Sequence, residues 1–235
     1  MSTTVRVTPR RPGEPPVDLL ELRVAHAVML RDLWRLAALA AAISAGSQRC
    51  DEKRARALAR YVGKVMDSVH EHHAAEDDLL WPVIAASAGD VVDLADLSDD
   101  HSVLDPRMDR IRAAATALAV DPGSEDAATT LSVGLADLRD LLVEHIADEE
   151  RTVFPVMTEY VSVADWALVT RQVRKRGGDL AFMLPRAFDS AAPADLADLK
   201  RAAGPLLLVL LALVRPRHRR FEQLVFADMQ EPGAS

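Results

Sequence analysis

Apolar residues recur along the chain at alternating intervals of three and four positions, the spacing of one face of an α-helix. The clearest stripe lies between positions 58 and 83 and consists of Leu58, Val62, Val65, Val69, His72, Glu76, Leu79 and Val83. Adding 73 to each number gives a second stripe: Leu131, Leu135, Leu138, Leu142, His145, Glu149, Thr152 and Val156. Every position keeps its character except Leu79, which becomes Thr152. The pattern predicts two long helices of one design.

A second pair of stripes is related by an offset of 75. The first is Leu19, Leu22, His26, Met29, Leu33, Leu36, Ala40 and Ile43, and the second is Leu94, Leu97, His101, Leu104, Met108, Ile111, Ala115 and Leu118. Each stripe is apolar apart from one histidine at the same place. Residues 17–160 therefore read as two repeated helical hairpins, and inward-facing stripes of this kind predict an all-α, up-down-up-down four-helix bundle.

The two ends of the chain differ from this region. Residues 1–16 are rich in Pro, Arg and Thr, and we expect a disordered tail. Residues 161–235 are predicted to form a C-terminal helical extension, with Ser162 and Asp165 as a capping box and Gly177-Gly178 as an interruption. Within the bundle, Pro106 should kink the third helix just after His101, because proline removes one backbone hydrogen bond.

Composition narrows the function classes. The 235 residues carry a net charge of −8, which argues against a nucleic-acid partner. The one cysteine, Cys50, allows no intrachain disulfide. The longest apolar run, at positions 205–214, is far shorter than the roughly 20 residues of a membrane span, and the N-terminus lacks the apolar region of a signal peptide. We expect a cytoplasmic protein with no membrane partner, and no protein partner can be named.

Candidate chemistry lies on the stripes themselves. Six ionisable residues occupy core-facing positions: His26, His72, Glu76, His101, His145 and Glu149. Burying such groups costs several kcal/mol unless something compensates, and a metal centre compensates all of them at once. One His-x-x-x-Glu pair alone is more often a surface ion pair, but two copies in register with two further histidines predict a metal site. Six ligands from four helices suit two ions bridged by carboxylates, and nitrogen and oxygen donors suit iron, manganese or zinc.

The segments HEHHAAEDDLLWP and EHIADEERTVFP, together with the single histidines of the first and third helices, resemble the hemerythrin, or HHE cation-binding, family. The resemblance covers about residues 17–160. It implies two non-haem iron ions with bridging carboxylates, with manganese or zinc less favoured. It also implies a small-molecule oxidant or diatomic gas as ligand, namely hydrogen peroxide, dioxygen or nitric oxide, with catalase-like turnover or with sensing.

Two departures from the oxygen-carrying members point to the bacterial hemerythrin-like branch. Those members have a second histidine one turn along the third helix, where this chain has Asp105, and their fourth-helix carboxylate follows its histidine by five residues rather than four. The resemblance therefore disfavours reversible oxygen transport. Asp105 and His73 are possible additional ligands, and His73 could equally serve as a hydrogen-bonded neighbour of His72. An enzyme, a sensor without turnover and a bundle with structural zinc stay open.

Overall fold

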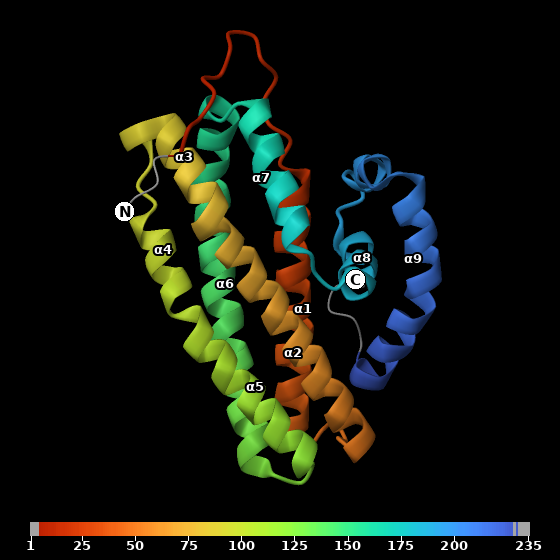
Figure 1. Cartoon of the computed structure of the whole chain (residues 1–235). Coiled ribbons are helices and arrows are strands. Elements are labelled where there is room, and N and C mark those ends of the chain that lie inside the picture. Colours follow the sequence, from red (N-terminus) through yellow and green to blue (C-terminus); the bar gives the residue numbers. More distant parts are fainter. Residues whose placement is uncertain (1–4, 228, 230–235) are drawn as a thin grey trace.

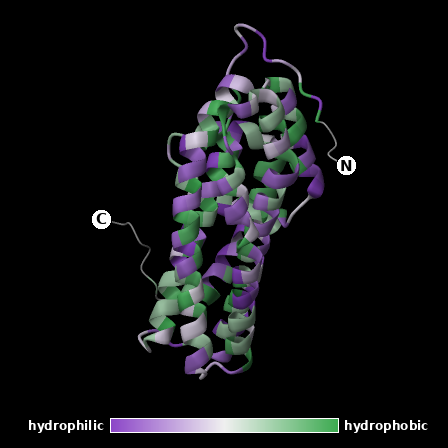
Figure 2. Ribbon diagram, turned by 90° about the vertical axis from the view of Figure 1, so that its left-hand side faces the viewer, coloured by the Kyte–Doolittle hydropathy of each residue, from purple (hydrophilic) through white to green (hydrophobic). Residues whose placement is uncertain are grey.

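The computed structural model describes residues 5–227 and 229, and this part of the chain is helical without any strand. The long helices α1 (Leu20–Ser44), α2 (Glu52–Ala75), α5 (Leu104–Val120) and α6 (Glu125–Tyr160) run side by side (Figure 1). Helix α1 packs along α6, α2 along α5, and α5 along α6. Both hydrophilic and hydrophobic residues occur along each of these helices, as expected of amphipathic elements (Figure 2).

Local sequence sets where these helices begin. Asp51 precedes α2, and its side chain accepts a hydrogen bond from the Arg54 N–H at 2.9 Å. Ser124 precedes α6 and accepts from the Ala127 N–H at 3.2 Å. Such caps satisfy backbone donors that have no partner in the first turn of a helix. The predicted stripes then close over a common core that includes Leu33, Val65 and Leu138.

The helix that follows α2 is not regular. A π-helical turn, η1 (Glu76–Leu80), leads into α3 (Trp81–Ala88), and the Trp81 N–H bonds the Glu76 carbonyl. Pro82 has no N–H with which to bond the Asp78 carbonyl in the α-helical pattern, and this favours the wider turn. The matching Pro155 lies inside α6, which continues to Tyr160. The sequence repeat did not predict this difference.

The third helical arm is divided in two. After η2 (Gly89–Val91), helix α4 (Ala95–Ser102) ends just before Val103, and α5 begins at Leu104. The Val103 N–H bonds the Asp100 and His101 carbonyls instead of one four residues back. The predicted break next to His101 is confirmed, and it coincides with Pro106 in the first turn of α5.

The C-terminal part is helical, as predicted. It consists of α7 (Val163–Arg176), α8 (Leu180–Ser190) and α9 (Leu196–Phe226), with a break inside α9 at Gly204, where φ is 66°. The Ser162 side chain accepts from the Asp165 N–H at 3.1 Å, so Ser162 caps α7 as predicted, while the Asp165 carboxylate accepts from the Ser162 hydroxyl at 2.8 Å. Helices α8 and α9 pack against α1 and α2, where the buried Arg186 of α8 pairs with the buried Asp32 of α1.

Residues 5–16 form no helix, but they contact the rest of the chain. The Thr8 N–H donates to Asp165 Oδ2 at 2.7 Å, and Glu14 Oε1 accepts from the Val163 N–H at 2.7 Å. This part of the predicted disordered tail therefore has defined contacts, whereas residues 1–4 lie outside the described residues. No helix among the described residues is long and apolar enough to cross a membrane.

Candidate metal centre

The structure brings all six predicted ligands together and adds His73. They form two overlapping groups, His26, His72, Glu76 and Glu149 in one and His73, Glu76, His101 and His145 in the other. Within each group the candidate ligand atoms all lie within 4.8 Å of one another. Glu76 belongs to both groups, so the two sets of candidate ligand atoms share its carboxylate.

The two oxygens of Glu76 lie near different histidines. Its Oε1 lies 2.9 Å from His72 Nε2, and its Oε2 lies 3.7 Å from His101 Nε2. On either side, His26 Nε2 is 3.3 Å from Glu149 Oε2, and His101 Nε2 is 3.1 Å from His145 Nε2. Lone pairs of imidazole and carboxylate thus converge from α1, α2, η1, α4 and α6.

The inward-facing nitrogen and oxygen atoms are arranged to coordinate a metal and not to hydrogen-bond one another. The Nε2 atoms of His26, His72 and His73 and both oxygens of Glu76 and Glu149 are buried and make no hydrogen bond of good geometry. Buried polar atoms without partners are rare in folded proteins and need compensation. Metal coordination would satisfy them together, so the residues present fit a pair of metal ions.

Outer partners fix the direction of the imidazoles. Nδ1 of His26 lies 2.8 Å from Glu150, and Nδ1 of His101 lies 2.9 Å from Asp77. The same atom of His145 lies 3.1 Å from Asp100, and that of His73 donates to the Val69 carbonyl at 2.7 Å. A partner on Nδ1 leaves Nε2 free to face a metal, as is usual for ligating histidines.

Sequence reasoning missed these outer carboxylates, although the repeat contained the signal. Asp77 and Glu150 are related by the same offset of 73 as the ligand pairs, and each directly follows a glutamate of the site. The aromatic-proline motif that ends each stripe has a related role. Trp81 stacks on His101 with ring centroids 6.0 Å apart, and Phe154 stacks on His26 at 5.8 Å.

Burial and neighbouring charges shift the pKa values of the site. Burial, with the adjacent Glu149 carboxylate, raises the pKa of Glu76 to about 8. Burial lowers the pKa of His72 to about 3. Burial also opposes protonation of His26, but the adjacent Glu149 carboxylate and the hydrogen bond with Glu150 outweigh it and raise its pKa to about 10. Without metal, the cluster needs protons to offset its carboxylates, and cations would take over that role.

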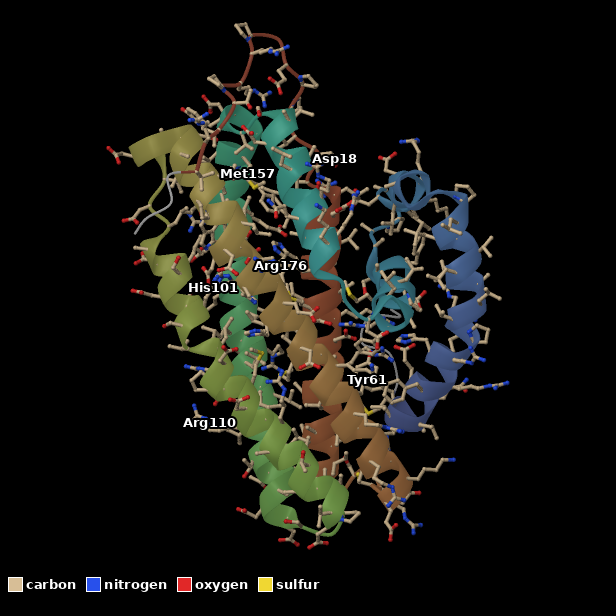
Figure 3. All side chains as sticks on the ribbon, in the orientation of Figure 1. Asp18, Tyr61, His101, Arg110, Met157 and Arg176 are labelled. Carbon is tan, nitrogen blue, oxygen red and sulfur yellow. The ribbon has the colours of Figure 1, made fainter. Side chains whose placement is uncertain are left out.

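Two other predicted or considered residues lie elsewhere. Asp105 is exposed and bonds His70 at 2.8 Å on the surface, so it lies in neither group. The suggestion that Asp105 is an additional ligand is corrected, because the break at Val103 separates the start of α5 from the face that carries His101. Tyr61 donates to Asp32 at 2.9 Å in the contact with α8 and α9, apart from His101 (Figure 3).

Seven imidazole and carboxylate side chains form two overlapping groups between the helices. The protein is therefore a helical one with a candidate paired metal site. Residues 18–157 match the family model of the hemerythrin HHE cation binding domain, and the chain belongs to this family. No curated protein and no solved structure matches the chain. Family membership and the His/Glu cluster together make this domain a metal-binding module, of a kind that typically binds iron.

Proposed function

We propose that the chain holds two non-haem irons and reacts with small oxidants, chiefly hydrogen peroxide, with dioxygen or nitric oxide as alternatives. The observation that carries the proposal is the pair of ligand groups that share Glu76. In this proposal, α1, α2, the α4–α5 arm and α6 are the arms of an up-down-up-down bundle made of two repeated hairpins. Residues 17–160 are then the metal-binding domain, and residues 161–235 are an extension of it.

The ligands divide between the two ions. His26, His72 and Glu149 would hold one, and His73, His101 and His145 would hold the other, with Glu76 between them. This donor set contains nitrogen and oxygen but no thiolate, which suits iron and disfavours iron–sulfur clusters. Manganese and zinc also accept such ligands, and we rank them below iron because the family typically binds iron.

Bound irons would relay two electrons from one hydrogen peroxide, which leaves as dioxygen, to a second, which takes up the two released protons and becomes two waters, so no other oxidant or reductant is needed. The chain's own residues prepare the site. Asp77, Asp100 and Glu150 orient the imidazoles from outside. Trp81 and Phe154 cover two of the ligand rings and limit the water that reaches them. His72 has the more open side of the site, with 13% of its side chain exposed, so a small oxidant would approach there.

A sensor without turnover is the second candidate, and one observation favours it. Helix α1 carries both His26, in the candidate centre, and Asp32, whose carboxylate pairs with Arg186 of α8. Asp32 also accepts from Tyr61. A change at the centre that displaced α1 would therefore reach the contact with α8, and the extension could report the state of the metal.

The experiment combines metal analysis with peroxide turnover. Protein purified in air should contain about two irons per chain, because each group offers enough ligands for one ion, and it should absorb in the near ultraviolet. The diferric protein should convert hydrogen peroxide repeatedly to water and dioxygen, measured with an oxygen electrode. A His70→Ala variant, altered at an exposed histidine outside both groups, is the matched control and should behave like the parent.

The possible results separate the candidates. One zinc per chain at full occupancy, without iron uptake on reconstitution, would contradict the di-iron proposal. A reversible oxygen-binding spectrum with no peroxide consumption would exclude the enzyme and leave a carrier or sensor. We expect the diferrous protein to oxidise in air instead.

A further inference from the structure

The outer face of α9 is apolar, and none of the residues that the structure describes covers it. Beyond the break at Gly204, Leu206 is 80% exposed, Val209 59% and Leu213 66%. These positions are three and four residues apart and so share one helix face. Pro205, Ala212 and Pro216 are also exposed, and no charged residue occurs from Pro205 to Val214.

The opposite face of α9 already packs within the chain. Leu211 forms a small buried cluster with Leu184 and Phe188 of α8, and Leu207 packs against it. Helix α9 lies at the edge of the molecule, so its outer face forms a ridge there (Figure 1). A contiguous exposed apolar patch of this kind marks an interaction surface more often than a solvated one.

Charge is distributed unevenly around this ridge. Residues 199–221 contain no Asp or Glu, in a chain whose net charge is −8. The same segment contains six basic residues: Lys200, Arg201, Arg215, Arg217, Arg219 and Arg220. Arg201 pairs with Asp198, and Arg215 pairs with Asp189. Arg217, Arg219 and Arg220 are exposed and have no ion-pair partner within the described residues.

The cationic residues continue the apolar face. Val209, Leu213, Pro216 and Arg220 follow one another at intervals of four, three and four, so Arg220 lies in line with the apolar ridge. Arg217 and Arg219 lie on the two sides of Arg220. The outer face of α9 is therefore apolar over its first turns after Gly204 and cationic at its end.

We propose that the outer face of α9 binds the surface of an anionic lipid bilayer. At such a surface, protruding apolar side chains enter the boundary between headgroups and acyl chains, while arginines contact anionic headgroups. The ridge offers both kinds of group on one side of one helix. The expectation of no membrane partner rested on the lack of a spanning segment, and binding to the surface needs no span.

A second copy of the chain fits this face less well. Parallel pairing of two α9 ridges would bring one arginine cluster against the other, and like charges repel. Antiparallel pairing would bring the cluster towards the other copy's Lys200 and Arg201. Three large apolar side chains also offer less area than the roughly 1,200–2,000 Å² that a stable interface buries.

The test uses the full chain and vesicles of two compositions. The protein should co-sediment with phosphatidylcholine vesicles that contain about a third phosphatidylglycerol, and much less with pure phosphatidylcholine, because each arginine near an anionic surface adds roughly fivefold in affinity. Raised salt should weaken the binding. Arg217→Gln/Arg219→Gln/Arg220→Gln should reduce affinity about 100-fold, and Leu206→Ser/Leu213→Ser at least about tenfold.

Matched variants control for general effects of charge and hydrophobicity. Arg110→Gln/Arg151→Gln/Arg171→Gln removes three exposed arginines elsewhere, and Val120→Ser/Val133→Ser removes two exposed valines. Both should bind vesicles like the parent. All altered side chains are exposed, so circular dichroism should show an unchanged fold.

Several results would overturn the proposal. These are an absence of binding to the anionic vesicles, equal loss of binding in the control variants, or undiminished binding in both α9 variants. A dimer in solution that Leu206→Ser/Leu213→Ser dissociates, without vesicle binding by the parent, would assign the face to a second copy instead. Vesicle binding that depends on the α9 residues and not on the control residues would support the proposal that this face binds an anionic bilayer.

Discussion

The two copies of the sequence repeat contribute similar but unequal halves of the candidate centre. In both copies a histidine is followed four residues later by a glutamate. The carboxylate directly after that glutamate, Asp77 or Glu150, contacts a histidine from the other copy, and an aromatic ring stacks on the same histidine. The halves differ at the residue after the histidine, which is His73 in the first and Ile146 in the second. They also differ where Asp100 supports His145, because the equivalent position in the first half is Ala25.

These differences make the two groups chemically distinct. The first hairpin supplies four ligand-type side chains and the second supplies three. Glu76 lies in both groups, whereas Glu149 lies in one. The repeat therefore establishes the frame of the site, while single substitutions decide how the ligand-type side chains divide between the two groups.

The backbone differs between the halves as well. The chain enters the π-helical turn η1 at Glu76, shortly after His72 and His73, whereas α6 continues as one helix past Glu149. A π-turn contains one residue more than an α-turn and often lies at functional sites. The half with the additional histidine is therefore also the half with the altered helix.

The largest expected effect on iron content comes from replacing Glu76, the carboxylate that both groups share. Glu76→Leu should leave less than about one iron per chain, whereas Glu149→Leu should retain about one, because the group of His73, His101 and His145 keeps Glu76. The iron content of each purified variant checks this. Apo Glu76→Leu should also melt at a higher temperature than the apo parent, because an apolar replacement removes a buried carboxylate.

Glu144→Leu, at an exposed position on the same helix as Glu149, is the control and should keep the parent's iron content. Equal iron loss in Glu76→Leu and Glu149→Leu would show that the two glutamates have the same role, and the proposed asymmetry would then be wrong.

The next effect concerns the residue that differs between the halves. His73→Ile gives the first half the residue of the second and should reduce the iron content to about one per chain, with loss of peroxide turnover. If His73 only supports other ligands, iron should stay and the rate should fall about 10–100-fold. Parallel measurements of iron and oxygen evolution separate these results, with His70→Ala as the control.

Much of the frame followed from the sequence, because helical periodicity and the two offsets are properties of the chain itself. The core-facing stripes, the break near His101 and the helix cap at Ser162 are found in the structure. The π-turn was not predicted, because Trp81-Pro82 and Phe154-Pro155 look alike in sequence and differ only in how the backbone accommodates the proline.

Most contacts around the candidate ligands could not be predicted from the sequence, because they are set by tertiary packing. Asp77 and Glu150 could have been inferred from the repeat, but Asp100 has no equivalent in the first half. The role of His73 could not be decided, since adjacent residues on a helix point about 100° apart and only packing shows which of them faces inward. The kink near His101 was predicted, but its direction was not, and the exposed position of Asp105 after the break at Val103 could not be read from the sequence.

A smaller effect tests whether the outer carboxylates of the two halves are equivalent. Asp77→Asn and Glu150→Gln should each weaken iron affinity about 10–100-fold, because each carboxylate holds the Nδ1 side of a candidate ligand. Competition with a chelator measures this affinity. Asp78→Asn, which loses only a surface pair with Arg176, should match the parent. A loss in Asp77→Asn without any in Glu150→Gln would show that only one half uses its outer carboxylate.

The smallest effect is expected at Asp105, where the resemblance and the structure disagree. Asp105→Ala removes an exposed pair with His70, and such pairs contribute little. We expect an unchanged iron content and a free energy of unfolding within about 0.5 kcal/mol of the parent, measured by urea denaturation. Asp109→Ala, one turn further along the exposed side of α5, is the control.

Asp105→His sharpens the same test, because it restores the residue type that oxygen-carrying relatives have at this position of the third helix. After the break at Val103, position 105 lies on the outer side of α5, where it contacts His70. The group that contains His101 and His145 already has a further histidine, His73. The new imidazole should therefore bind no iron, and the absorption spectrum and peroxide turnover should match those of the parent. A changed spectrum, or rescue of the iron lost in His73→Ile by Asp105→His, would show that α5 can turn inward and that the third arm supplies a second ligand after all.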